Sequence, residues 1–576
     1  MHNRLTGTSR SCTMLLGGIL GLAWFLYVFG PSLLDPTYLS WIMQGDGAQH
    51  VLGWLFFRNA PWSWPLGAIP SFPYPVGTTV GYTDSMPWLA IAAKIFSPFL
   101  PADFHYAGLW SGWCFFLQGW FGVRIVQALS PHPFVQLLGG ACFVFDPVLL
   151  RRIGQPSLCA HWLILGLIWL HLHAWPVGQA PRRPLASALA FCLISAGIHP
   201  YLAVMVLALS LALLWKLQWV DRRLPIGPMA VWAGVYGAAV LGVFTTFGYI
   251  GSGMAWAREG IGIYSADILT LVNSGGTSRF FPPLPQAPGQ EDGFGYVGGG
   301  VLVLSVIGML VICYHPGILR RRSLKPWVPL GICGALLALY AFSSKVKMAG
   351  IPILTLDEFY RPFFTIAAIF HATGRFIWPL HYLWITAVVA IVIAYYQASR
   401  YTLYLILAAI ITIQIIDLNV PLLGWGWQHQ RKPPLTFEGG AGERATGLYR
   451  HIVLYPPEIW GGSLPGCVMP PFTMEILDRY VPLAYQAYRL KMTFNSGYFA
   501  RINQKKSVKY CQELHHKIQE GEFEQDTIYV VHNHYWDRVS PHIPKIVCGR
   551  LGEYITCVSA LRDDALRDVL EQHKVE

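Results

Sequence analysis

Charge is what this sequence has least of. Asp, Glu, Lys and Arg together make up 12% of its 576 residues, whereas hydrophobic residues make up 54%. Soluble globular domains carry about 25% charged residues, so the deficit excludes an ordinary soluble domain and indicates a membrane protein. The basic excess lies in residues 1–424, with 23 Lys and Arg against 13 Asp and Glu. Short cytoplasmic loops of membrane proteins account for such an excess, and we expect no binding of nucleic acid.

Several sequence signatures are also missing. The chain has no Walker loop, no dinucleotide-binding glycine pattern and no zinc-ligand spacing, which argues against the common nucleotide-dependent and zinc-dependent enzymes. It has no internal repeat, and its apolar runs are almost free of charged residues. Transporters typically show repeats and carry charged groups near the middle of the bilayer, so a transporter is the less favoured class.

Eleven apolar runs approach the roughly 20 residues that a membrane-spanning helix needs. The first run follows Arg4 and Arg10 and is longer than a signal-peptide core, with no small-residue cleavage site after it, so we interpret it as a retained anchor. The sequence therefore predicts a polytopic α-helical membrane protein. The predicted spans are residues 12–34, 106–128, 134–149, 158–176, 184–199, 201–219, 228–249, 297–315, 327–343, 377–396 and 402–418.

A shorter apolar run at residues 86–100 decides the predicted topology. If this run lies along the membrane interface, the basic groups at 182–183, 222–223 and 320–325 all fall on the side of the N-terminus. The positive-inside rule then makes the N-terminus cytoplasmic. The long loops, residues 35–105, 250–296 and 344–376, lie outside in this arrangement, which indicates that the function is performed on the outer face.

The composition changes near Trp425, where charge rises and strand-like runs appear at residues 451–455 and 527–531, with a helical stretch at 505–519. We predict two domains, a membrane module (1–424) and an extracytoplasmic α/β domain (425–576). Four of the 11 cysteines lie in the second domain and could form one or two disulfides, with three pairings open. They are Cys467, Cys511, Cys548 and Cys557.

The first outer loop contains the most informative stretch, Gly45-Asp46-Gly47-Ala48-Gln49-His50. Asp46 follows the first span closely, and His50 would share its face of a helix. A carboxylate at this boundary can act as a general base when its surroundings tune its pKa. The alternative is that Asp46 caps the helix that follows. Gln49, Tyr82 and Asp84 are candidates for substrate binding in the same loop.

Arginines contradict the positive-inside trend in the second outer connection. Arg151 and Arg152 lie there with Gln155, and His161 begins the next span. Guanidinium groups at this boundary could hold a lipid phosphate, or they could simply reach toward the headgroups.

A further arginine, Arg375, lies at the outer end of the tenth span, with His371 just before it and Arg361 earlier in the loop. A salt-bridge network within the loop is the alternative to substrate binding here. Glu291 and Asp292 could bind an acceptor or cap the eighth span, and we favour the cap.

These features together resemble the GT-C superfamily of membrane glycosyltransferases. The resemblance rests on the early Asp46, on Pro147-x3-Arg-Arg-x-Gly154, on Gly374-Arg375-Phe376, and on the C-terminal outer domain. Gln49-His50 and the stretches 74–84, 157–165 and 373–379 look like those of a group of bacterial membrane proteins of this type.

The resemblance implies a fold and an activity. It implies transfer of a sugar from a polyprenyl phosphate or diphosphate to a glycan, lipid or protein acceptor, at the outer face of the bacterial inner membrane with the C-terminal domain in the periplasm. Asp46 would be the base, with His50 beside it, and Arg375, then Arg152, would bind the phosphate. Related oligosaccharyltransferases carry acidic metal ligands in the second outer loop, which this chain lacks, so we expect inverting transfer without a metal or another cofactor. The alternative is a transporter or a flippase of lipid-linked glycans.

Overall fold

The computed structural model describes residues 2–173, 175, 181–254, 260–318, 324–418, 445–460, 480–552 and 554–575. The chain forms two compact units. The first comprises residues 1–35, 108–243 and 258–429, and the second comprises residues 36–107, 244–257 and 430–576. The predicted domain boundary at residues 424 and 425 lies outside the described residues.

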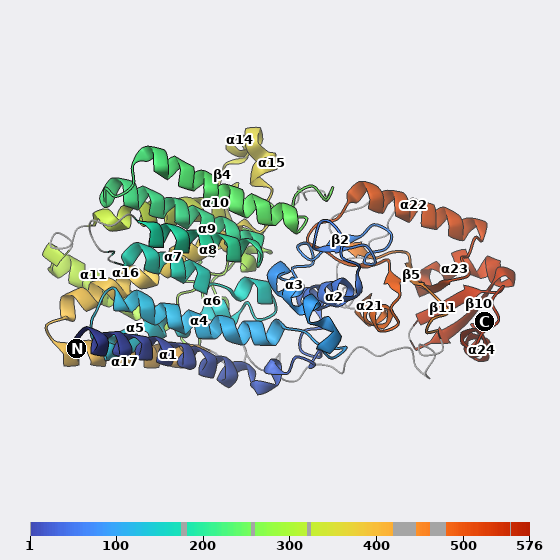
Figure 1. Ribbon diagram of the computed structural model, residues 1–576, viewed down its shortest axis with the longest axis horizontal. Helices are drawn as coiled ribbons and strands as arrows, with labels where there is room; N and C mark the ends of the chain where they lie inside the picture. The colour runs from blue at the N-terminus through green and yellow to red at the C-terminus, as the bar shows by residue number, and fades with distance from the viewer. Residues whose placement is uncertain are drawn as a thin grey trace. The chain divides into compact units, whose positions relative to one another are not determined.

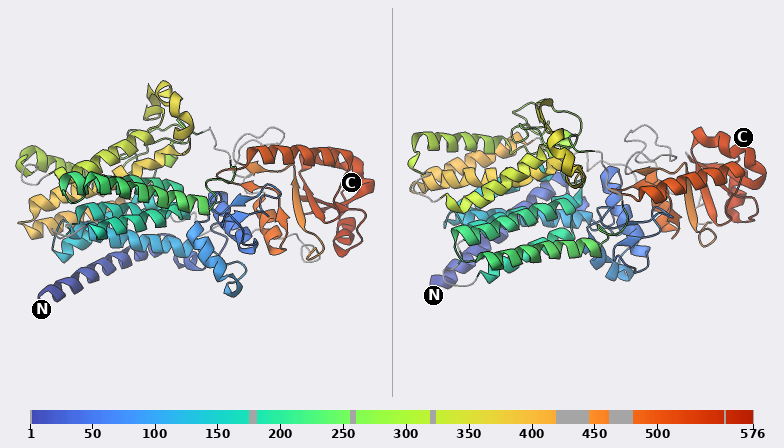
Figure 2. Two further views of the ribbon diagram at one scale, coloured as in Figure 1. Left: turned by 45° about the horizontal axis from the view of Figure 1, so that its top comes forward. Right: turned by 90° about the horizontal axis from the view of Figure 1, so that it is seen from above.

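The first unit is a bundle of helices that run side by side (Figures 1 and 2). A helix lies at each of the eleven predicted spans, although several helices are shorter than the apolar runs that predicted them. The helices are α1 (His2–Phe29), α4 (Ala107–Gln127), α5 (Pro133–Val144), α7 (Trp162–Leu172), α8 (Arg182–Ala196), α9 (Pro200–Trp215), α10 (Ile226–Thr246), α11 (Gly299–Tyr314), α13 (Val328–Ala341), α16 (Trp378–Tyr396) and α17 (Arg400–Asp417).

Length and hydropathy mark several of these helices as candidate membrane spans. Among the described residues, five helical segments are long and apolar enough to cross a membrane: Arg10–Phe29, Pro200–Val220, Ile226–Thr246, Thr373–Tyr396 and Arg400–Asp417. Four more apolar helices are shorter. Only 17% of the apolar stretch of α10 is buried, so this helix presents an apolar surface of the kind that lipid covers. The chain is therefore a membrane protein, and the number of eleven crossings stays a prediction.

Small residues allow the bundle to pack closely. Where α1 meets α4, a Cβ atom on Gly119 would lie 2.0 Å from the carbonyl oxygen of Gly17, and one on Gly21 would lie 2.0 Å from that of Phe115. Backbones approach this closely only when no side chain intervenes, which is a common device for packing membrane helices.

The second unit contains a five-stranded sheet in the order β10-β11-β9-β5-β7. Strand β5 is parallel to β7 and β9, whereas β11 is antiparallel to both β9 and β10. Helix α22 (Gln504–Glu520) packs on the sheet through Leu514 and Ile518 (Figure 1). The predicted α/β domain is confirmed, and the two predicted strands and the helix lie where the sequence placed them. The strands are β5 (His451–Tyr455), β7 (Thr493–Phe494), β9 (Thr527–Val531), β10 (Ile546–Leu551) and β11 (Tyr554–Ser559).

Three of the four cysteines of the predicted C-terminal domain are described, and all three are disulfide-bonded. Cys548 and Cys557 face each other across β10 and β11 and are bonded. Cys511 is also disulfide-bonded, and Cys467 lies outside the described residues. The other seven cysteines are free, and all of them precede residue 425.

Residues 36–105 of the predicted first outer loop belong to the second unit. Its residues 71–74 pair with the end of β7, through Tyr74 N–H to the Phe494 oxygen (2.7 Å) and Phe494 N–H to the Ser71 oxygen (3.1 Å). Asp103 accepts hydrogen bonds from Tyr485 (2.7 Å) and Arg489 (2.9 Å) of helix α21 (Tyr480–Arg489). A sequence cannot show that a loop inserted between two spans folds onto a domain that lies almost 400 residues later in the chain.

The apolar run at residues 86–100 contains helix α3 (Pro87–Ile95), which has nine residues. Nine residues extend about 14 Å, less than half of the roughly 30 Å hydrocarbon core, so this helix is too short to cross. Its Lys94 is buried and donates to the Ala60 oxygen (2.8 Å). Burial lowers the pKa of Lys94 to about 8. Its position along the interface stays a prediction.

Candidate functional site

The two arginines predicted to bind phosphate meet at one carboxylate in the first unit. Arg375 Nη2 donates to both carboxylate oxygens of Asp292 (3.1 and 3.4 Å). Arg152 Nη1 donates to Asp292 Oδ1 (3.4 Å), and its Nη2 donates to the Asp292 backbone oxygen (2.9 Å). The arginine side chains are 8% and 9% exposed, and that of Asp292 is 20% exposed. We call Arg152, Arg375 and Asp292 the arginine cluster.

A close backbone contact brings Arg375 to this place. Gly374 packs directly on Gly293, so that a Cβ atom on Gly374 would lie 2.6 Å from the Cα atom of Gly293. The contact joins the 3-10 helix Thr373–Ile377, which leads into α16, to the short helix Gln290–Gly293 that carries Asp292. This packing gives the Gly-Arg pair of the sequence motif a physical explanation.

The charges of the arginine cluster do not cancel. Burial by itself raises the pKa of Asp292, but the guanidinium groups of Arg375 and Arg152 outweigh it and hold the pKa below its usual value. Burial lowers the pKa of Arg152 to about 10, while Asp292 raises it and Arg375 lowers it. At neutral pH two guanidinium groups and one carboxylate leave a net charge of +1. Arg152 Nε is buried without a hydrogen-bond partner among the described residues, which leaves a donor for an anionic ligand.

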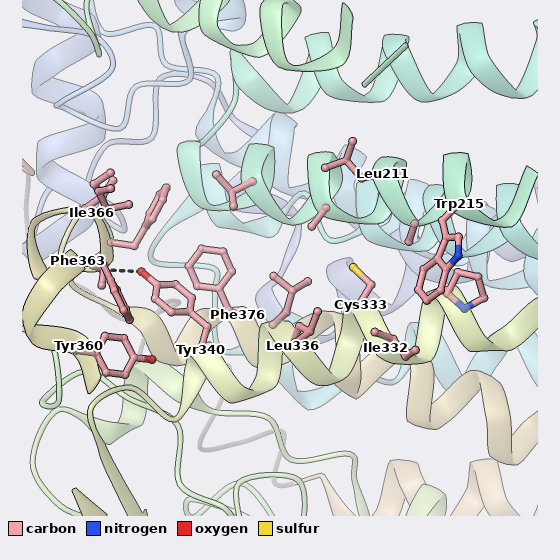
Figure 3. Close-up of a pocket in the computed structure, with 18 of the residues that line it drawn as sticks. Leu211, Trp215, Ile332, Cys333, Leu336, Tyr340, Tyr360, Phe363, Ile366 and Phe376 are labelled. Atoms are coloured by element: carbon pink, nitrogen blue, oxygen red, sulfur yellow. Dashed lines mark hydrogen bonds between the residues drawn. The ribbon is translucent and has the colours of Figure 1, made fainter. Parts of the chain in front are cut away.

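An apolar groove of about 680 Å³ lies between α9 and α13 in the same unit (Figure 3). Leu211 and Trp215 of α9 face Ile332 and Leu336 of α13, and the loop residues 359–370 close one end. The lining side chains are almost all apolar or aromatic, and the volume is typical of sites for small molecules, about 300–1,000 Å³.

The groove ends next to the arginine cluster. Phe376 lines the groove and directly follows Arg375. The ring of Tyr201 lies 4.9 Å from Arg375 Cζ and 5.7 Å from the ring of Phe376. One aromatic ring therefore separates the guanidinium group from the apolar groove.

Two other predicted residues lie beside the arginine cluster. Gln155 Oε1 accepts from Arg152 Nη1 (3.1 Å). His371 is half-buried, packs edge-on against Tyr264 with ring centroids 5.6 Å apart, and interacts electrostatically with Asp292. Their substrate-binding roles stay predictions.

Arg361 and His161 are not hydrogen-bonded to the arginine cluster in the part of the chain that the structure describes. The Arg361 side chain is 75% exposed and bonded to Glu358, which is the loop salt bridge that the sequence left as the alternative. His161 is fully buried and faces the hydroxyl group of Tyr382 (2.7 Å).

The favoured interpretation of Asp292 as a helix cap was wrong. The first turn of α11 is capped from α17, because Asp417 Oδ2 accepts from Gly299 N–H (2.8 Å) and Gln414 Oε1 accepts from Val301 N–H (3.1 Å). Asp292 lies too early in the chain to reach this turn and pairs with the arginines instead. A cap can come from any helix that ends nearby, so sequence proximity does not identify it.

The predicted catalytic residues lie in the second unit, on helix α2 (Gly45–Asn59). The N-cap position is Gln44, so Asp46 lies in the first turn, where a carboxylate is stabilised by the helix dipole. Asp46 and His50 share a helix face, as predicted.

The next loop segment packs on this helix. His50 Nδ1 donates to the Asp84 oxygen (2.5 Å), and Gln49 Nε2 donates to the Tyr82 oxygen (3.0 Å). Asp46 itself is half-buried. The structure thus places Gln49 and His50 against the backbone of Tyr82 and Asp84, and the catalytic and binding roles of these residues and of Asp46 stay predictions. In the part of the chain that the structure describes, no three His, Cys, Asp or Glu side chains are grouped to hold a metal, and transfer without a metal also stays a prediction.

A family model described as "Domain of unknown function (DUF6311)" matches residues 18–419, and the model of its C-terminal domain matches residues 443–559. The chain belongs to the DUF6311 family. No curated protein matches it.

Two solved structures that resemble the DUF6311 chain are both of an oligosaccharyltransferase from Archaeoglobus fulgidus. The apo form is 11% identical with a TM-score of 0.43, over 95% of this chain and 74% of that one. The complex with an inhibitory peptide and a dolichol-phosphate is 9% identical with a TM-score of 0.40, over 94% and 72%. Likenesses of this size do not establish a common fold.

The sequence missed a second polar group in the DUF6311 chain. Asp146 lies within the apolar run 134–149 and is fully buried. Its carboxylate contacts His381 Nε2 (3.1 Å) and accepts from the Tyr382 hydroxyl group (2.5 Å). The expectation that the predicted spans are almost free of charge overlooked this carboxylate. An aspartate inside an apolar run was the available signal, because a buried charge needs a partner.

Proposed function

We propose that this protein is a membrane glycosyltransferase that uses a sugar linked to a polyprenyl phosphate or diphosphate. The observation that carries the proposal is the arginine cluster, with its net charge of +1, at the end of the apolar groove. An anionic head beside a long apolar chain is the chemical character of a polyprenyl phosphate. The groove follows α13 from Ile332 to Tyr340, eight residues or about 12 Å, and is lined to hold the part of the chain nearest the phosphate.

The expected chemistry follows from the sequence resemblance. An acceptor oxygen attacks the anomeric carbon of the sugar, the bond from that carbon to the phosphate oxygen breaks, and the leaving polyprenyl phosphate keeps the electron pair. Asp46 takes the proton of the acceptor as it attacks. Because the attack comes from the face opposite the leaving phosphate, this single displacement inverts the anomeric centre, and it proceeds without a metal. The arginines stabilise the negative charge that develops on the leaving group. The acceptor is a glycan, a lipid or a protein.

The cell compartment is proposed on two grounds. Disulfides form in oxidising compartments, and the described disulfide of this chain, Cys548–Cys557, lies in the C-terminal domain. The positive-inside rule independently places that domain outside. We place the protein in the inner membrane of a bacterium with this domain in the periplasm. A reporter fused after residue 322 should be cytoplasmic and one fused after residue 576 extracytoplasmic, and the same side for both would overturn this topology.

Binding of a short lipid phosphate tests the central proposal. The full-length protein in lipid nanodiscs is titrated with farnesyl phosphate, which is expected to bind. Arg375→Lys should weaken binding by about tenfold or more, because Lys keeps the charge but loses the two-pronged bond that a guanidinium group makes to phosphate. The control is Arg400→Lys, an exposed arginine at the start of α17, which should bind as the wild type does. Failure of the wild type to bind, or equal loss in both variants, would refute the phosphate site.

A transporter of lipid-linked glycans is the second candidate, since the buried Asp146–His381 contact is a charged group among apolar helices. Proteoliposomes distinguish the two functions. Movement of a labelled lipid phosphate across the bilayer without transfer of its sugar would favour transport.

A further inference from the structure

A buried polar group lies next to the arginine cluster and takes no part in the proposed chemistry. Asp146, His381, Tyr382 and His161 are each fully buried in the first unit. Hydrogen bonds join them in a chain: Asp146 lies 3.1 Å from His381 Nε2 and accepts from the Tyr382 hydroxyl group (2.5 Å), and that hydroxyl lies 2.7 Å from His161 Nδ1. Burying an ionised carboxylate without partners costs a large free energy. The hydrogen-bond partners of Asp146 therefore determine whether it is ionised or protonated.

Counting donors assigns the proton between Asp146 and His381. His381 Nδ1 faces the Gly295 oxygen (2.8 Å), which can only accept, so Nδ1 carries a hydrogen. The other ring nitrogen, Nε2, faces Asp146 Oδ1 (3.1 Å), which also accepts from Val148 N–H (3.0 Å). The other carboxylate oxygen, Oδ2, accepts from the Tyr382 hydroxyl group (2.5 Å), and the two donors besides His381, Val148 N–H and the Tyr382 hydroxyl, favour the ionised carboxylate. This count assigns the hydrogen between Asp146 Oδ1 and His381 Nε2 to Nε2, which makes the contact a buried ion pair.

One side of this ion pair holds the backbone next to Asp292. Four consecutive carbonyl oxygens each accept from a side chain: residue 292 from Arg152 (2.9 Å), 293 from Thr270 (2.6 Å), 294 from Trp378 (3.3 Å) and 295 from His381 (2.8 Å). A loop segment held at four successive carbonyls has little freedom. His381 provides the last of these bonds, three residues from Asp292.

The other side of the ion pair supports Arg152. Tyr382 bonds to His161, and the ring of His161 lies 4.4 Å from the ring of Trp378. The guanidinium group of Arg152 also packs on the Trp378 ring, with its Cζ atom 5.1 Å from the ring centroid. The same ion pair thus reaches both Asp292 and Arg152 through separate contacts.

We propose that the Asp146–His381 ion pair is the positioning element of the arginine cluster. It fixes Asp292 through Gly295 and supports Arg152 through His161 and Trp378, and Asp292 in turn orients Arg375. Asp146 and His381 are positioning residues and do not contact the donor. The effect on donor binding rests on the proposed function, whereas the ion pair and its hold on the arginines do not.

Two measurements without ligand test the ion pair. The infrared spectrum of the wild type minus that of Asp146→Asn should show an ionised carboxylate band, and a protonated carboxyl band in its place would overturn the proton assignment. Arginine-specific labelling by phenylglyoxal, read by mass spectrometry, should leave Arg152 and Arg375 protected in the wild type. His381→Gln keeps a donor for Gly295 but no longer supplies a charged partner for Asp146, and should make both arginines reactive.

A control separates positioning from general loss of stability. His171→Gln removes another buried histidine of the bundle, whose Nδ1 faces the Leu167 oxygen (2.9 Å), and should leave both arginines protected even if it lowers the melting temperature as much. Equal labelling in the two variants, or none in His381→Gln, would refute the positioning role.

Farnesyl phosphate links this proposal to function. His381→Gln should weaken its binding by about 10- to 100-fold, the range seen when outer partners of a metal ligand are removed, and His171→Gln should not. If the wild type does not bind farnesyl phosphate but the labelling result holds, the proposed function fails and the positioning element stands. If binding is normal in His381→Gln, the positioning element fails and the proposed function stands.

Discussion

Replacing Asp292 by Asn separates the stability of the arginine cluster from its affinity for phosphate. The carboxylate forms ion pairs with both Arg152 (3.4 Å) and Arg375 (3.1 Å). Removing one partner of a buried ion pair costs about 3–5 kcal/mol. Because Asp292 is 20% exposed, we expect the lower end of this range, about 3 kcal/mol of unfolding free energy.

The same substitution should strengthen phosphate binding. In the wild type, Asp292 competes with the ligand for the guanidinium groups and repels its negative charge. Two like charges about 5 Å apart interact by about 3 kcal/mol at an effective dielectric constant of about 20. Screening reduces this value, whereas the Asn oxygen still accepts from both arginines and keeps them oriented, so we expect an increase in affinity of about tenfold, or about 1.4 kcal/mol. Farnesyl phosphate should therefore recover part of the lost stability, as a ligand that binds only the folded state does.

The assay is thermal unfolding of the protein in nanodiscs, with and without farnesyl phosphate. The control is Asp267→Asn, because the buried Asp267 carboxylate accepts from the backbone N–H groups of Leu269 (2.9 Å), Ala349 (3.1 Å) and Gly350 (3.0 Å) and bonds no arginine among the described residues. Asp267→Asn should lower stability without a larger response to the ligand. The reasoning is refuted if Asp292→Asn is as stable as the wild type, or if the ligand stabilises it less than the wild type.

Three further predictions concern other parts of the chain. Asp46→Asn should insert and fold normally but reduce sugar transfer by about 10²–10⁴-fold, the usual contribution of a general base; Asp84→Asn should lose less, and the opposite order would show that the wrong carboxylate was assigned. Leu336→Trp should weaken farnesyl phosphate binding by filling the groove, whereas the equally exposed Leu339→Trp on the same helix lies outside the lining and should not. Replacing both Cys548 and Cys557 by Ser should destabilise the C-terminal domain by about 2–3 kcal/mol, because the closed loop is short, and an unchanged denaturation midpoint would contradict the bond.

Hydropathy placed the helices well but could not place their ends. All eleven apolar runs contain a helix, since a segment in lipid must satisfy its backbone hydrogen bonds internally. The run 134–149 illustrates the error at the ends. Helix α5 stops at Val144, and Asp146 begins a separate short helix, Pro147–Leu150, by accepting from Val148 N–H. A hydropathy average does not detect such a break between two helices. This break nevertheless contains Asp146, the carboxylate at the centre of the neighbouring polar group.

Part of the candidate site could likewise be recognised from the sequence, and part could not. Arg152 and Arg375 were recognised because arginines on the predicted outer side oppose a strong statistical preference. Asp292 was assigned to a cap, and Asp146 and His381 were not recognised at all. Each of these three residues depends on partners more than 80 positions away in the sequence, and one sequence contains no record of such distances.

The sequence by itself determined which part of the chain is surrounded by lipid and which by water, and where helices and strands alternate. The scarcity of charge fixed the membrane class, and the alternation of short strands with helices fixed the α/β class of the C-terminal domain, because both depend on how neighbouring residues meet water or lipid. Tertiary structure alone decided which side chains meet. Close contacts such as Gly374 on Gly293 bring Arg375 to Asp292, and the cost of burying an unpaired charge then selects the partners. Local pattern sets where a charge is tolerated, but only packing decides what neutralises it.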